Sequence, residues 1–330
     1  MMRPSGFTIA VLVLAAGVAL ASVDLFRLER QTLVVYTTPA LRDFLEGFVV
    51  PHFRANFSVD ITPVYVSAGE QYNRLRISGG HPEADVFLHA SPLFLEKGFA
   101  GGYFLPFTVR GDSTIPPTFK GSNVTGGHAW YAFAWSPLVE VYDPAFGAPP
   151  DLASINTAFG FPHPLLSNNG IYAVLFFENV SAAAGLRALA HTVVQPVNAR
   201  ANILGVAEGD FAVTLGYEAV TLFYVKQGAR VNFPLRLPIL AGQNYVTPVL
   251  FSVGLVKGHP NAFASDLIEF LFRDTVQSNL GRYYFRSVLP NSTAPAGGVP
   301  LPAPGAVTID YNWSKWSGLE AALPKYVIGG

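Results

Sequence analysis

Residues 130–142 read WYAFAWSPLVEVY, a run that is too long and too apolar for a surface loop. We expect it to form one extended strand, interrupted at Ser136-Pro137 because proline has no backbone N–H to donate. A second apolar run of the same character, YVTPVLFSVGLV, occupies residues 245–256. If the first run leaves one lobe and the second returns to it, the two strands form a double hinge. Such a hinge permits two lobes to close around a ligand.

The chain before the first hinge strand alternates between strand and helix patterns. Strands are expected at residues 32–36 (TLVVY), 59–66 (VDITPVYV) and 84–88 (ADVFL), and a helix pattern follows each of them. The second of these helices begins after Ser67, which stands at capping-box spacing from Glu70. This alternation is typical of an α/β protein, in which helices cover both faces of a mostly parallel sheet.

The region between the two hinge strands has a similar pattern. Helices are expected over residues 170–190 and 218–227 with a strand over 211–216. Beyond the second hinge strand, further helices are expected at 262–272 and from Thr275 toward Tyr284. The sequence therefore predicts a two-lobed α/β fold. We expect these divisions: 32–135 as the first part of lobe 1, 136–249 as lobe 2, 250–290 as the return to lobe 1, and 291–330 as a Pro/Gly-rich connector with a closing helix.

The first residues of the chain predict export. Residues 7–23 carry no charged side chain and follow the single charge of Arg3. The Ala19-Leu20-Ala21 pattern before Ser22 favours residues 1–23 as a cleaved signal peptide, with a retained membrane anchor as the alternative. We expect the protein to act outside the cell, as a secreted, cell-surface or periplasmic protein.

The composition excludes several classes of function. The chain has no cysteine, so it has no disulfide, no thiolate metal site and no lipid-bearing cysteine. Only 13% of its residues are charged and the net charge is −1, which argues against a nucleic-acid partner. Sequons for N-glycosylation suggest a glycosylated outer face. They stand at Asn56, Asn123, Asn179, Asn291 and Asn312.

Small and polar residues stand where the predicted strands end and the next helices begin. In open parallel sheets the ligand site lies off the carboxyl ends of the strands, where helix N-termini present free N–H groups and positive dipole ends. Facing turns of this kind on two lobes would surround an anion without requiring Lys or Arg. The candidate ligand-binding residues are Thr37, Thr38, Ser67, Ala68, Gly69, His89, Ser91, Ser136, Ser167, Asn168, Asn169, Gly170, Tyr217 and Glu218.

Several stretches occur in an order that resembles the type II extracellular solute-binding proteins of ABC importers. They include LVVYTTPALRDFLEGF (33–48), VSAGEQYNRL (66–75), GGHPEADVFLHAS (79–91), AEGDFAVTLGYEAV (207–220) and GLVKGHPNAFASDLIEFLF (254–272). The resemblance covers about residues 32–290. It implies the two-lobed fold, a small ligand between the lobes, and an ABC permease as the membrane partner.

Two branches of that family compete. The stretch FGFPHPLLSNNGIY (159–172) resembles the molybdate and tungstate binders, although Ser167-Asn168-Asn169 stands where they carry a carboxylate. The iron(III) branch often has two adjacent tyrosines at the position of Tyr217, and here Glu218 follows it, so these two residues are the metal ligands if the ligand is iron. The pair Tyr283-Tyr284 falls in a late helix and is expected to pack there.

We therefore expect a monomeric solute-binding protein without a cofactor that captures a small oxyanion of the molybdate or tungstate type, with iron or an iron chelate as the alternative. Motifs of hydrolases, zinc proteases and nucleotide-binding enzymes are absent from the sequence. An exported enzyme on the same fold is the second alternative. Hinge movement near Ser136 and Val249 would close the lobes on the ligand.

Overall fold

The computed structural model describes residues 32–258, 261–290 and 294–329. The predicted leader, residues 1–23, and the sequon at Asn291 lie outside these ranges. In the part of the chain that is described, no helix has the length and apolar character needed to cross a membrane. The other four sequon asparagines are all exposed.

One ten-stranded sheet runs through the molecule in the order β2-β1-β3-β13-β7-β10-β8-β9, with β4 paired to β13 and β14 paired to β7. Strands β1, β2 and β3 are parallel, as are β8, β9 and β10, whereas the long strands β7 and β13 are antiparallel to each other. The strands are β1 Thr32–Thr37, β2 Asp60–Tyr65, β3 Val86–His89, β4 Phe104–Leu105, β7 Tyr131–Tyr142, β8 Phe159–Gly160, β9 Thr192–Val194, β10 Val213–Tyr217, β13 Pro248–Val256 and β14 Arg286–Ser287. Short strands outside this sheet are β5 Asn123–Val124, β6 Gly127–His128, β11 Ile239–Leu240, β12 Gln243–Val246 and β15 Val307–Thr308.

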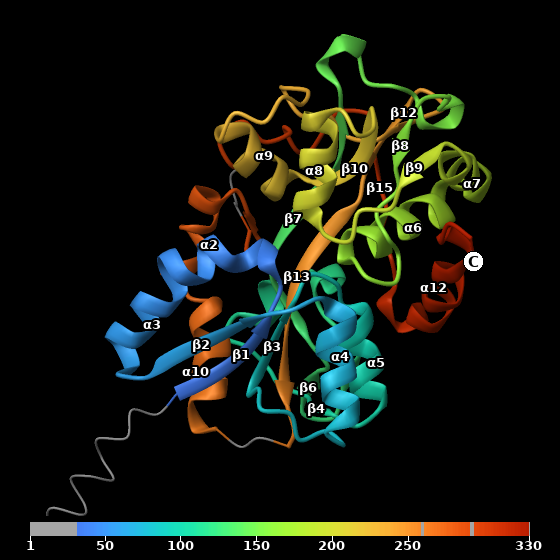
Figure 1. Ribbon diagram of the computed structural model, residues 1–330. Coiled ribbons are helices and arrows are strands. Elements are labelled where there is room, and N and C mark those ends of the chain that lie inside the picture. The colour runs from blue at the N-terminus through green and yellow to red at the C-terminus, as the bar shows by residue number, and fades with distance from the viewer. Residues whose placement is uncertain (1–31, 259–260, 291–293, 330) are drawn as a thin grey trace, which may run out of the picture.

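Helices pack around each end of the sheet, and the molecule consists of two halves (Figure 1). The first half contains β1 to β4, α2 to α5 and α10, and the second half contains β8 to β10 and α6 to α9. This arrangement confirms the predicted α/β fold with two halves joined by long strands. The domain boundaries given above stay a prediction. The helices are α2 Arg42–Phe44, α3 Val50–Phe57, α4 Ala68–Ile77, α5 Leu93–Ala100, α6 Asn168–Val180, α7 Ala182–Ala190, α8 Ala199–Glu208, α9 Glu218–Lys226, α10 Ala262–Leu271, α11 Asp274–Gln277 and α12 Trp316–Ala322.

The crossing between the halves is narrow. Strand β7 runs through Pro137 without the expected interruption, and Pro137 stands opposite Pro248 of β13. On the outer sides, β14 pairs with β7 only as far as Trp135, β10 pairs with β7 only from Leu138 onward, and β3 pairs with β13 only from Ser252 onward. At the two prolines the sheet is therefore two strands wide. Neither proline has an N–H group to donate, so few hydrogen bonds join the strands at this point.

Three helical regions differ from the sequence expectation, and the one expected over residues 170–190 is divided at Ser181 into α6 and α7. The helix after β1 is continuous from α2 into α3 through a π-helical turn, Leu45–Val49, because Pro51 has no N–H for an ordinary helical bond. The helix expected from Thr275 toward Tyr284 is not continuous. It consists of the short α11 and a 3₁₀ turn, Leu280–Tyr283, which ends at Tyr284 with a positive φ of 66°.

The chain closes with a segment that contacts both halves. It contains a 3₁₀ turn at Trp313–Lys315, α12 and a second 3₁₀ turn at Leu323–Tyr326. Glu320 of α12 pairs with Lys97 on α5 of the first half. Trp313 packs edge-on against Tyr172 on α6 of the second half, and the ring centroids are 5.8 Å apart. The closing helix expected from the sequence therefore lies against both halves (Figure 1).

Candidate functional site

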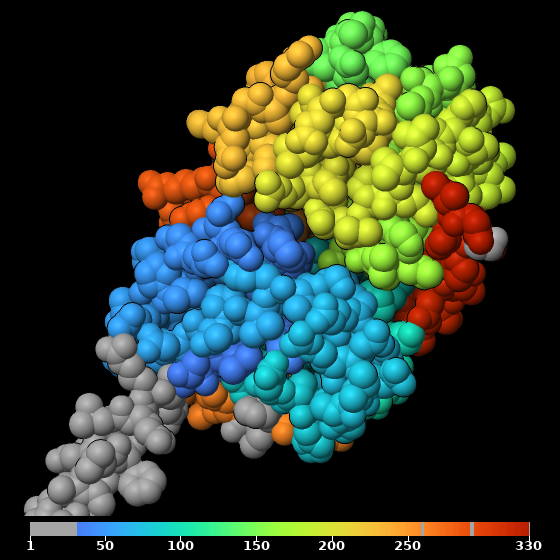
Figure 2. Space-filling model, viewed as in Figure 1, coloured from blue at the N-terminus to red at the C-terminus, as the bar shows by residue number. Residues whose placement is uncertain are grey.

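A cleft of about 950 Å³ lies between the two halves. Its walls come from the ends of β1, β2 and β10, from the starts of α4, α6, α8 and α9, and from the turn at residues 282–285. In Figure 2 the blue residues of the first half and the yellow residues of the second half face each other across this region. Seven of the predicted site residues line the cleft: Thr38, Ser67, Ala68, Ser167, Asn168, Asn169 and Tyr217.

Four helices present their first turns to the cleft. Ser67 caps α4 by accepting a hydrogen bond from the N–H of Glu70 at 3.3 Å, which is one half of the expected capping box. Ser167 caps α6 by accepting from the N–H of Asn169 at 3.2 Å, and Asn198 caps α8. Helix α9 begins directly after Tyr217. The positive dipole ends of α4, α6, α8 and α9 therefore meet at one cavity, which favours an anion there.

Three buried residues of the second half that line the cleft carry unpaired polar atoms. Tyr217, Asn168 and Asn169 are 1%, 8% and 1% exposed. The Tyr217 hydroxyl and the Oδ1 atoms of both asparagines are buried and have no partner among the described residues. Burial, with a smaller effect of nearby Tyr172, raises the pKa of Tyr217 well above its ordinary value, so the group is a neutral hydroxyl. These atoms need partners that the described part of the chain does not supply.

Charged groups stand around the cleft opening. Arg42, Arg200 and Arg282 line it and are exposed, and the exposed acidic Asp43 lines it beside Arg42. Arg42 lies 4.4 Å above the ring of Tyr65, whereas Arg200 and Arg282 have no ion-pair partner among the described residues. The sequence-based expectation that no arginine is required did not anticipate this positive rim. The expectation that helix N-termini face the ligand, applied to the start of α8, would have found Arg200, because Arg200 follows the cap Asn198.

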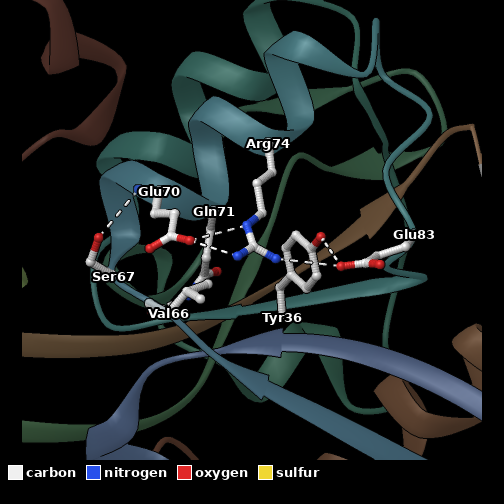
Figure 3. Close-up of polar contacts among 7 residues, drawn as sticks. All are labelled: Tyr36, Val66, Ser67, Glu70, Gln71, Arg74 and Glu83. Atoms are coloured by element: carbon white, nitrogen blue, oxygen red, sulfur yellow. Dashed lines mark hydrogen bonds and ion pairs between the residues drawn. The ribbon is translucent and has the colours of Figure 1, made fainter.

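The acidic residue nearest the α4 start is neutralised within the first half (Figure 3). Glu70 accepts from Arg74 at 2.7 Å, and Arg74 also contacts Glu83 at 3.4 Å. Glu83 in turn accepts a hydrogen bond of 2.6 Å from the hydroxyl of Tyr36 on β1. This network fixes α4 against β1 and draws the Glu70 carboxylate toward Arg74.

Aromatic rings form much of the remaining wall. Tyr283 packs edge-on against Phe44 with ring centroids 5.5 Å apart, and it still lines the cleft together with Tyr284. The sequence placed this pair in a packing helix, but the 3₁₀ turn and the positive φ of Tyr284 direct that segment to the cleft. Further half-buried rings here are Tyr65, Phe223 and Tyr224. Tyr65 ends β2, so the strand-end rule applied to Thr37 would also have found it.

Three predicted residues that do not line the cleft take part in structural contacts in the first half and at the crossing. The buried ring of His89 lies with Nε2 3.4 Å from the Ala68 carbonyl, and burial lowers its pKa to about 4. Ser91 accepts a hydrogen bond from the N–H of Leu93 at 3.3 Å. Ser136 on β7 accepts from the N–H of Ala219 at 3.0 Å and so supports the start of α9.

The remaining four also lie outside the cleft lining. Glu218 is fully buried and holds Arg286 through two hydrogen bonds of 2.8 Å. Thr37 is buried at the end of β1. A Cβ on Gly170 would come within 2.5 Å of the His163 carbonyl, so this glycine allows the loop to pack on α6. A Cβ on Gly69 would lie 3.5 Å from the Leu165 carbonyl oxygen, which belongs to the opposite half.

No protein-family model and no curated protein matches the chain. Solved structures do match over nearly its whole length. The periplasmic binding protein AfuA from Actinobacillus pleuropneumoniae, with fructose-6-phosphate bound, has a TM-score of 0.76 at 15% identity and covers 91% of this chain and 98% of its own. Iron-bound HitA from Pseudomonas aeruginosa has a TM-score of 0.73 at 15% identity, with 90% and 99% covered. A periplasmic thiamin-binding protein has a TM-score of 0.70 at 18% identity, with 90% and 95% covered. The chain therefore has the two-lobed fold of the type II periplasmic binding proteins.

Proposed function

We propose that this protein is the extracellular solute-binding component of an ABC importer, and that it captures an anion between its halves and delivers it to a membrane permease. The observation that carries the proposal is the cleft, onto which four helix N-termini and three arginines open. The similar structures are themselves periplasmic binding proteins rather than enzymes. The apolar residues 7–23 support a location outside the cell.

Closure of the two halves is the proposed mechanism. A ligand that contacts Asn169 in the second half and Thr38 in the first favours the closed arrangement, because only that arrangement gives it both sets of contacts. The two-strand crossing at Pro137 and Pro248 is where bending costs fewest hydrogen bonds. The closed form then docks on the permease and releases the ligand.

Iron is the second candidate ligand. Tyr217, Tyr283 and Tyr284 line one cleft, and phenolates are ligands for ferric iron. Against this, burial opposes ionisation of Tyr217, and Glu218 is held by Arg286. In the described part of the chain, no three His, Asp or Glu side chains converge to hold a metal ion. These observations favour the anion.

Isothermal titration and small-angle scattering test the proposal. The probes are molybdate, tungstate, sulfate, phosphate, ferric citrate and a panel of organic anions. We expect at least one anion to bind and to reduce the radius of gyration. Tyr217→Phe and Asn169→Ala should each weaken its binding about tenfold, because each removes a hydrogen bond from a desolvated site. If no probe binds or compacts the protein, the solute-binding proposal fails.

A further inference from the structure

Unpaired polar atoms of residues that line the cleft restrict the chemistry of the ligand. The Nδ2 of Asn169 donates to the carbonyl of Leu215 at 2.6 Å, so the amide cannot be turned around without placing two oxygens together. Its Oδ1 must therefore be the atom without a partner. The side chain of neighbouring Asn168 makes no hydrogen bond to the described residues, so its amide can present either its oxygen or its nitrogen to a partner. Amide oxygens accept hydrogen bonds and cannot donate them, so the ligand has to bring donors to this wall.

A fully ionised inorganic oxyanion has only acceptor oxygens. Molybdate, tungstate and sulfate could receive hydrogen bonds from the helix N-termini and the Tyr217 hydroxyl, but they would leave the Asn169 oxygen buried and unpaired. Each such unpaired group costs about 1–3 kcal/mol. Hydroxyl groups on a carbon skeleton can donate to this oxygen and also accept from Tyr217.

The size and walls of the cleft point in the same direction. A tetrahedral oxyanion occupies roughly two to three times the ~30 Å³ of a water molecule, so it would fill about a tenth of the 950 Å³. Cavities of about 300–1,000 Å³ are typical of organic ligands. The half-buried rings of Tyr65, Tyr224 and Tyr284 provide apolar faces for a carbon skeleton, which an inorganic ion would not use.

The positive groups define the other end of the ligand. Arg200, in the first turn of α8, and Arg282 line the same cleft without an ion-pair partner among the described residues. Guanidinium groups bind phosphate and carboxylate through paired hydrogen bonds. Hydroxyl donors are thus required at the start of α6, and an anionic group is favoured near the arginines.

We infer that the ligand is a hydroxylated organic anion, a compact sugar or polyol that carries a phosphate or a carboxylate. Its hydroxyl groups donate to Asn169 and pair with Asn168, its ring or chain lies on the tyrosines, and its anionic group meets the arginines. This inference rests on the proposed solute-binding function and narrows its ligand class.

Calorimetric titration of the intact protein with matched probes tests the inference. The panel contains sugar phosphates and sugar acids of three to six carbons, the neutral sugars, phosphate and molybdate. We expect a sugar phosphate or a sugar acid to bind at least about tenfold more tightly than the neutral sugar and the inorganic ions. Comparison of the sugar phosphates with the sugar acids shows which anionic group the protein recognises. If molybdate or phosphate binds as tightly as every organic anion, the inference is wrong and the solute-binding proposal stands. If nothing in the panel binds, both fail.

Variants at Asn168 separate ligand contact from a structural role. Its side chain makes no hydrogen bond to the described residues, so Asn168→Leu should leave the melting temperature unchanged or raise it. The same change should weaken binding of the hydroxylated anion about tenfold, because it removes a partner of a ligand hydroxyl. Asn179→Leu, at the other end of α6, is the matched control and should leave affinity unchanged. Equal affinity of the Asn168→Leu variant for the hydroxylated anion would overturn the assignment of the hydroxyl contacts.

Discussion

The role of His89 in this fold depends on its surroundings more than on its residue type. It ends β3 beside the α4 start and is 1% exposed, with its Nδ1 unpaired. Sequence alone places it among the candidate ligand residues because it follows a strand. The structure instead buries it behind the cleft, against Phe94 at a ring separation of 5.6 Å. A strand-end histidine is thus a packing group here.

The burial of His89 predicts a pH dependence of stability. The unfolded chain takes up a proton near the ordinary pKa of 6.5, whereas the folded protein resists protonation until about 4. The free energy of unfolding should therefore fall as the pH drops from 6.5 to 4, by up to about 3 kcal/mol. Urea unfolding of the wild type and of His89→Gln across this range measures the difference. The same substitution at exposed His191 is the control. Parallel pH curves for the wild type and His89→Gln would contradict the prediction.

At the scale of elements, close packing of helices on strands depends on glycines that have no special backbone angle. Gly216 in β10 faces α8, and a Cβ there would lie 2.8 Å from Ile203 and 2.9 Å from Val141. Gly318 in α12 is exposed, and a Cβ there would meet no other atom within 4 Å. A side chain at position 216 would therefore be crowded by its neighbours, whereas a side chain at position 318 would not.

This difference gives opposite expected effects of the same substitution. Gly216→Ala overpacks the α8 contact and should lower the free energy of unfolding by about 1–3 kcal/mol. Gly318→Ala removes a poor helix former from an exposed position and should raise it by about 0.5–1 kcal/mol. Thermal and urea unfolding of both variants measures the pair. Equal effects of the two changes would show that packing at Gly216 does not matter.

Elements with strong hydrophobic patterns were predictable from the sequence, and those set by tertiary contacts were not. The runs at β1, β3, β7 and β13 are buried on both faces, so their apolar residues alone mark them as strands. The split of the late helix was not predictable, because it depends on the left-handed conformation of Tyr284. The caps at Ser67 and Ser167 were found, but the arginines and aromatic rings of the cleft come from elements far apart in sequence.

At the scale of the whole molecule, the closing segment limits how the halves can move. Its α12 contacts α5 of the first half, and Trp313 just before α12 packs on α6 of the second half. Farther on, the hydroxyl of Tyr326 donates to Glu178 on α6 at 2.7 Å. Any change in the angle between the halves must therefore rearrange the contacts on one side of α12. Figure 2 shows this red segment running along the side of the molecule beside both halves.

Reversal of one charge tests this coupling. Glu320→Lys places two lysines together and should lower the population of the arrangement seen here, which scattering of the free protein would record as a changed radius of gyration. Because the Lys97–Glu320 pair is partly exposed, we expect the loss of stability to be at most about 1 kcal/mol. The double variant Lys97→Glu/Glu320→Lys should restore the wild-type profile. A radius of gyration that is identical in all three proteins would show that the pair does not couple the halves.

The place of β13 in the sheet also constrains how the chain can fold. It is the last of the long strands to be synthesised, yet it lies between β3 and β7, where Val253 stands opposite Leu88 and Tyr131. Until residues 248–256 have emerged, β3 keeps an unpaired edge and the first half cannot complete its sheet. Contacts between such distant residues form slowly and leave strand edges open to aggregation in the meantime. A chain that ends before β13 should therefore give insoluble protein rather than a folded half.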